Sequence, residues 1–180
     1  MSPVAFYVAI AIVLAAVFTY LAVGRRVGRL TVENARSLMG SLDIEAFRNL
    51  VDPEEDAFLQ SCLPADQFKT IKRERAWAAL AYARTLSHIA LEFSRFGNAL
   101  RHSPDPSLAE LGREVATGAV HLRMLALQAT ARLFISAAFP KLPQRSLRSL
   151  FEQYGHSASL LARYRMLERA RKQPSQPSLA

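Results

Sequence analysis

Hydrophobic residues recur every three or four positions over three long stretches of this chain, which is the spacing of an α-helix with one buried face. The stretches cover about residues 66–101, 106–139 and 145–171. A turn containing two prolines follows the first stretch, and Pro140 and Pro143 follow the second. Short connections make successive long helices antiparallel. The pattern therefore predicts an antiparallel three-helix bundle over residues 64–172.

Two shorter helices are expected before the bundle, each beginning at an aspartate that can cap its N-terminus. Asp43 precedes a run whose apolar residues fall on one helical face, and Asp52-Pro53 is followed by acids, which the helix dipole favours in a first turn. No stretch shows strand signals. We therefore predict an all-α fold in which residues 24–63 form a juxtamembrane segment and short helices that pack on the bundle.

The segment from Val4 to Val23 contains twenty residues and no charge. As an α-helix it would be about 30 Å long, the thickness of the hydrocarbon core of a bilayer. Tyr7 and Tyr20 lie near its ends, as the aromatic belts of a spanning helix do. A cleaved signal peptide would carry basic residues before a shorter apolar run. We predict one N-terminal transmembrane helix at 4–23.

The basic residues around this segment predict its orientation. Arg25, Arg26 and Arg29 follow it directly, and no lysine or arginine precedes it. The positive-inside rule then places residues 1–3 outside the cell and the rest of the chain in the cytoplasm. Because arginine predominates over lysine, as in GC-rich bacterial genomes, the expected location is a bacterial plasma (inner) membrane, crossed in a single pass.

A second apolar run lies at 124–139. Gln128 and Arg132 interrupt it, and a central arginine costs about 2.5–3.5 kcal/mol on membrane insertion. The run is therefore expected in the core of the bundle, with a position along the membrane surface as the alternative. After Lys172 the sequence QPSQPSLA predicts a disordered tail at 173–180.

The formal net charge of +8 indicates an acidic partner. The arginines after the predicted span would contact headgroups of the bilayer. A second candidate contact surface combines basic residues from two helices: Lys69, Lys72, Arg73, Arg163, Arg165, Arg169, Arg171 and Lys172. We expect this surface to bind anionic lipid or an acidic protein, with nucleic acid less favoured. Homo-oligomerisation is left open.

Six acids lie between residues 43 and 56, the one acidic patch of the chain. They lack the alternating ligands and the glycine of a calcium loop, so helix capping and a solvated face are the preferred interpretation. Contact with a basic partner or with the basic C-terminal region is the alternative.

The remaining chemistry is sparse. The four histidines include no pair three or four positions apart, and a metal site needs more ligands than two. His88 and His121 would lie at the same level of the predicted hairpin, so they are the centre of any unrecognised site. Cys62 is the single cysteine and is interpreted as a small apolar residue. No nucleophile motif or Gly-rich phosphate loop is present.

We therefore expect no catalytic, cofactor-binding or metal-binding residues and no cofactor. The predicted function is a non-enzymatic binding, scaffold or accessory subunit at the cytoplasmic membrane face. The first alternative is an enzyme or phosphorelay component with a site in the bundle, and the second is a membrane tether for nucleic acid.

Overall fold

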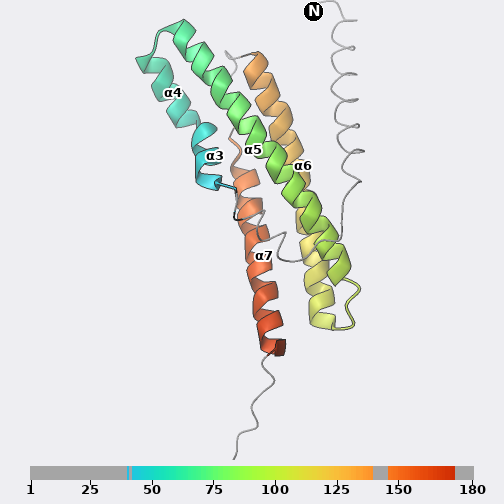
Figure 1. Cartoon of the computed structure of the whole chain (residues 1–180). Helices are drawn as coiled ribbons and strands as arrows, with labels where there is room; N and C mark the ends of the chain where they lie inside the picture. Colours follow the sequence, from blue (N-terminus) through green and yellow to red (C-terminus); the bar gives the residue numbers. More distant parts are fainter. Residues whose placement is uncertain (1–39, 41, 140–145, 173–180) are drawn as a thin grey trace, which may run out of the picture.

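The computed structural model describes residues 40, 42–139 and 146–172 (Figure 1). Over these ranges the chain forms α-helices joined by short turns and contains no strand, which confirms the predicted all-α helical bundle. The expected span at 4–23, the arginines Arg25, Arg26 and Arg29, and the expected tail at 173–180 lie outside the described residues. No helix within the described ranges combines the length and the apolar character needed to cross a membrane.

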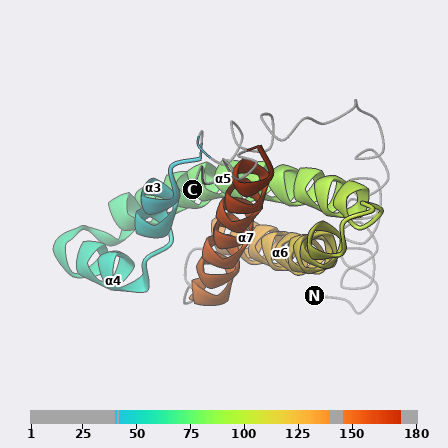
Figure 2. The ribbon, with the colours of Figure 1, turned by 90° about the horizontal axis from the view of Figure 1, so that it is seen from below.

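Two long helices form an antiparallel hairpin, and a third lies along one side of it. The hairpin consists of α5 (Ala65–Leu100) and α6 (Pro106–Ala138). The third helix, α7 (Arg148–Lys172), runs in the same direction as α5 (Figure 1). A view along the hairpin shows α7 crossing on one side of the α5–α6 pair (Figure 2). The bundle therefore has an up-down-up arrangement.

The short helices begin where their aspartates predict. In α3 (Ile44–Leu50) the Asp43 carboxylate accepts a hydrogen bond from the backbone N–H of Ala46, at 2.9 Å. In α4 (Pro53–Cys62) the Asp52 carboxylate accepts one from Glu54, at 3.0 Å. Each side chain satisfies a backbone donor that the helix itself leaves unpaired.

Two of the three longer helices, α6 and α7, also begin at a side chain that accepts a hydrogen bond from the backbone, whereas α5 has no such cap. Asp105 caps α6 through the backbone N–H of Ser107, at 2.8 Å. Ser146 Oγ accepts a hydrogen bond from the backbone N–H of Arg148, at 3.2 Å, so α7 begins at Arg148 rather than at the expected residue 145.

Two glycines let α5 and α6 approach closely beside their connecting turn. A Cβ atom on Gly97 would lie 2.4 Å from the backbone nitrogen of Ala116, and a Cβ atom on Gly112 would lie 2.4 Å from that of Arg101. Both distances are far inside van der Waals contact. Only glycine therefore fits at either position without a shift of the helices.

The core between the helices consists of two clusters of buried residues. One surrounds Leu86, Leu122 and Leu150 in the middle of the bundle, and the other surrounds Phe93 and Val115 near the hairpin turn.

The helix α3 joins the first of these clusters through Phe47, which is fully buried. Its ring stacks on Tyr82 of α5, with centroids 5.5 Å apart, and meets Phe151 of α7 edge to face, at 5.3 Å. Phe47 therefore connects α5 and α7 from the side.

Candidate functional site

The structure does not gather the predicted basic contact residues into one patch. Lys69 and Arg73 lie near the start of α5, whereas Arg163, Arg165, Arg169 and Arg171 lie along the second half of α7. These two regions are at opposite ends of the molecule (Figure 1). The side chain of Lys172 lies outside the description.

Several of these bases are also engaged within the protein. Arg163 lies 2.8 Å from a Glu114 oxygen, Arg171 lies 3.3 Å from Asp105, and Lys69 lies 2.9 Å from Asp66. The first two ion pairs connect α7 to α6 and to its cap.

The assignment of Lys72 to a contact surface is wrong. Its side chain is buried, and its Nζ lies 3.6 Å from Oδ2 of Asp56, which is itself buried. The pair joins α5 to α4. Sequence periodicity places Lys72 beside exposed bases, but the short helix α4 covers it.

Two acids of the patch, Glu55 and Asp56, contact α5, and within the described residues none of the six pairs with a base of α7. Arg75 donates hydrogen bonds to Glu55 Oε2 at 2.8 Å and to the backbone oxygen of Asn49 at 2.6 Å, and its Nε lies 3.6 Å from Asp56 Oδ1. The pKa of Glu55 lies below its usual value, chiefly because its carboxylate accepts the hydrogen bond from Arg75. Arg75 thus connects α3 and α4 to α5.

The two histidines singled out by their level in the hairpin are both exposed. His88 Nε2 lies 3.9 Å from Oε1 of Glu92 on its own helix. Over the same ranges no group of three or more His, Cys, Asp and Glu side chains could hold a metal ion. Cys62 is a free cysteine and is exposed at the end of α4.

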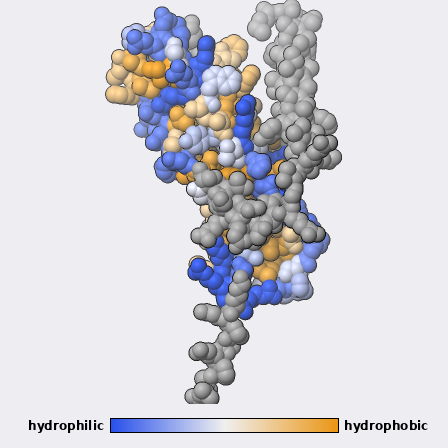
Figure 3. All heavy atoms as spheres, in the orientation of Figure 1, coloured by the Kyte–Doolittle hydropathy of each residue, from blue (hydrophilic) through white to orange (hydrophobic). Residues whose placement is uncertain are grey.

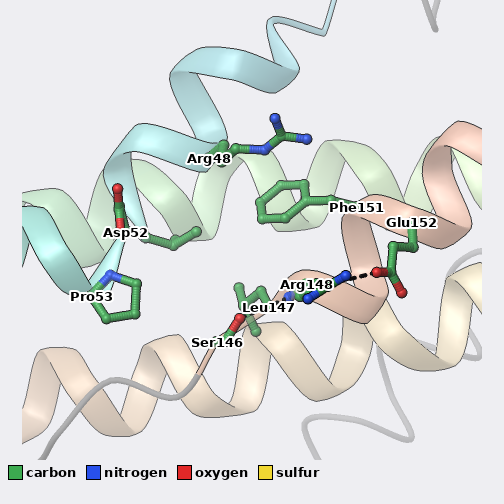
Figure 4. Close-up of a pocket in the computed structure, with 9 residues that line it drawn as sticks. Arg48, Asp52, Pro53, Ser146, Leu147, Arg148, Phe151 and Glu152 are labelled. Carbon is green, nitrogen blue, oxygen red and sulfur yellow. Dashed lines mark hydrogen bonds and ion pairs between the residues drawn. The ribbon is translucent and has the colours of Figure 1, made fainter.

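A pocket of about 430 Å³ lies between the α3–α4 junction and the start of α7 (Figure 4). Its charged groups already have partners within the protein. Arg148 pairs with Glu152 at 2.7 Å, and Arg48 lies over the Phe151 ring, 5.4 Å from its centroid, and pairs with Glu45 at 3.3 Å. The pocket therefore offers a ligand little free polar chemistry.

The most distinctive surface is an apolar stripe on α6. The large exposed side chains of the stripe, which are 49–66% exposed, are Val120, Met124, Phe134, Ile135 and Phe139. The partly buried Leu127 and the exposed Ala131 and Ala138 lie between them at helical spacing. From residue 120 to residue 139 the stripe is about 28 Å long. Figure 3 shows hydrophobic atoms at the surface near the upper end of α6 and near α4.

This stripe faces away from α7. Gly118 points toward α7, because Gln153 donates a hydrogen bond to its backbone oxygen at 3.1 Å. Val120 lies two positions further on, which turns its side chain by about 200° on an α-helix. The buried residues Leu122, Ala129 and Leu133 lie on the inner side of the same helix. Thus α6 carries an inner apolar face in the core and a separate outer one.

Trp77 extends the stripe onto α5. Its ring meets that of Phe134 edge to face, with centroids 6.3 Å apart. Both rings remain about half exposed. We call the set of Trp77, Val120, Met124, Phe134, Ile135 and Phe139 the outer apolar surface.

The charges left unpaired on the hairpin are mainly positive. Within the described residues, the arginines of α5 and α6 that form no ion pair are Arg73, Arg84, Arg113, Arg123 and Arg132. The carboxylates without one are Glu74 and Glu110, over the same two helices. The hairpin that carries the outer apolar surface therefore has an excess of uncompensated positive charge.

The outer apolar surface differs from the preferred sequence prediction, which places the apolar run at 124–139 in the core of the bundle. The spacing of apolar residues along α6 does indicate this second surface. Residues 122, 126, 129 and 133 form one helical row, and residues 120, 124, 127, 131 and 134 form a second. Two apolar rows on opposite sides of one helix indicate two different partners.

Comparisons of the chain with protein-family models, with curated proteins and with solved structures found no match.

Proposed function

We propose that this chain is a single-pass membrane protein whose helical domain acts at the cytoplasmic membrane face as a non-enzymatic binding, scaffold or accessory subunit. The observation that carries the binding role is the outer apolar surface, since contiguous exposed apolar side chains on a folded domain mark an interaction site. The uncharged segment at 4–23 and the arginines that follow it support the membrane location.

The location has a direct test in cells. A reporter that fluoresces only in the cytoplasm, fused after Ala180, should be bright, and the chain should stay with the membrane after carbonate washing. A second fusion, with a reporter active only in the periplasm, is the control and should be silent. A dark cytoplasmic reporter together with an active periplasmic reporter would contradict the proposed orientation. Release of the chain by carbonate would show that it is not anchored in the membrane.

The binding role is tested by crosslinking the full-length chain in its native membrane and purifying it. Met124→Glu combined with Ile135→Glu changes the outer apolar surface at two exposed positions. Met166→Glu on α7, where the side chain is 70% exposed, is the matched control. The proposal expects crosslinked partners, protein or lipid, that the double variant loses and the control keeps. Identical products from all three chains would contradict it.

A further inference from the structure

We infer that the outer apolar surface binds an anionic lipid bilayer, with Trp77 and Phe134 at the level of the interface and the unpaired arginines of the hairpin near the headgroups. The inference deepens the proposed function and rests on it, because the anchor would bring this domain to the membrane.

The chemistry of the exposed side chains matches the interfacial region of a bilayer. Tryptophan and phenylalanine, with aliphatic residues beside them, form the apolar face of helices that lie in the membrane plane. Here Trp77 and Phe134 are half exposed, and Met124 and Ile135 lie along the same side of the hairpin. A surface about 28 Å long on one side of a helix can lie along a membrane interface.

The charges on the hairpin favour an anionic membrane over a neutral one. Arg73 and Arg84 lie on α5 close in sequence to Trp77, and Arg113, Arg123 and Arg132 lie along α6. In the described part of the chain no carboxylate neutralises them. Basic side chains at a membrane surface are attracted to anionic headgroups, and salt weakens this attraction.

The same charges make a second copy of this chain a less favourable partner for the outer apolar surface than an anionic membrane. A two-fold interface places the same patch on both sides. Pairing α6 with α6 would bring Arg113, Arg123 and Arg132 of one copy toward the same set on the other, and like charges across an interface oppose association. Anionic lipid supplies the opposite charge that a second copy lacks.

The single tryptophan of the chain is Trp77, so tryptophan fluorescence, excited at a wavelength where the tyrosines do not absorb, reports on this surface alone. The full chain is reconstituted into vesicles of phosphatidylcholine, with or without phosphatidylglycerol, in which a fraction of the lipid is brominated on the acyl chain near the headgroup. We expect strong quenching and a blue shift with phosphatidylglycerol, and weaker quenching in phosphatidylcholine or at high salt. Equal quenching in both lipids, or none in either, would overturn the inference.

Variants separate this result from misfolding and from self-association. Met124→Glu with Ile135→Glu should lose the quenching with an unchanged helical circular dichroism spectrum, and Met166→Glu should keep it. Replacing Arg84 and Arg132 by Gln should weaken the preference for anionic lipid, because two of the five unpaired arginines are lost. Met124→Cys in a chain whose native cysteine is replaced by Ser reports on pairing: disulfide-linked dimers with unquenched Trp77 would assign the surface to a second copy instead.

Carbonate extraction of the same vesicles distinguishes failure of the lipid-binding inference from failure of the proposed membrane anchor. A chain that resists extraction but leaves Trp77 unquenched overturns the lipid-binding surface and keeps the anchor. A chain that is extracted overturns the anchor on which the proposed function depends.

Discussion

Trp77 of α5 and Phe134 of α6 meet edge to face, with 6.3 Å between ring centroids and 89° between ring planes, although about half of each ring is exposed. Aromatic pairs of this geometry are usual in protein interiors. Here the pair lies on the side of the hairpin that α7 leaves uncovered. Its energetic contribution to the fold is therefore smaller than that of a core pair, while its apolar surface remains available for binding.

The first prediction compares Phe134 with a buried phenylalanine of the hairpin. Phe134→Ala should lower the free energy of unfolding by about 1 kcal/mol, because only the ring contact and part of the ring's burial are lost. Phe93→Ala should cost about 3–5 kcal/mol, because Phe93 is 1% exposed and its removal leaves a cavity. Urea unfolding measures both, and equal losses would show that Phe134 belongs to the core.

The second prediction concerns two helical glycines. Gly97→Ala should destabilise the fold by about 1–3 kcal/mol, because its Cβ would lie 2.4 Å from the Ala116 backbone nitrogen. Gly155→Ala is the matched change on α7, where no atom lies within 4 Å of the added Cβ, and should stabilise by about 0.5–1 kcal/mol. Thermal unfolding measures the midpoint of each variant. A shift of both midpoints in the same direction would contradict the close approach of α5 and α6 at Gly97.

The third prediction concerns two lysines on α5. Lys72→Ala should cost about 3 kcal/mol, because it removes a buried partner of the buried Asp56 carboxylate. Lys69→Ala removes an exposed pair with Asp66 three residues away and should cost less than about 1 kcal/mol. Chemical unfolding of the two variants should differ clearly. A neutral Lys72→Ala would mean that α4 does not depend on this contact.

The fourth prediction follows from the hydrogen bond between Arg75 and Glu55. The pKa of Glu55 is lower in the folded protein than its usual 4.5, so the contact stabilises the fold above that value. The stabilisation is lost as the pH falls through the lower folded value. The difference in unfolding free energy between the native chain and Glu55→Gln should therefore be present at about pH 6 and decrease progressively as the pH falls below 4.5. A difference in unfolding free energy that stays constant as the pH is lowered would contradict a stabilising hydrogen bond between Arg75 and the ionised Glu55 carboxylate.

Local sequence is enough to place the helices. Asp43 and Asp52 predict two starts, because a cap acts on backbone N–H groups two or three residues away. Hydrophobic spacing predicts the long helices, because their inner faces recur with the period of the helix itself. Short connections predict that α5 and α6 are antiparallel. None of these inferences requires knowledge of distant residues.

Packing between the helices, in contrast, determines which side chains of each helix meet solvent. The burial of Lys72 depends on α4, the closeness at Gly97 depends on the backbone of α6, and the exposure of Phe134 depends on α7 lying on the other side of the hairpin. Hydrophobic periodicity shows that a helix has an apolar face, but α6 has two. The physical reason is that burial is a property of the whole packed chain, whereas capping and helical spacing are properties of neighbouring residues.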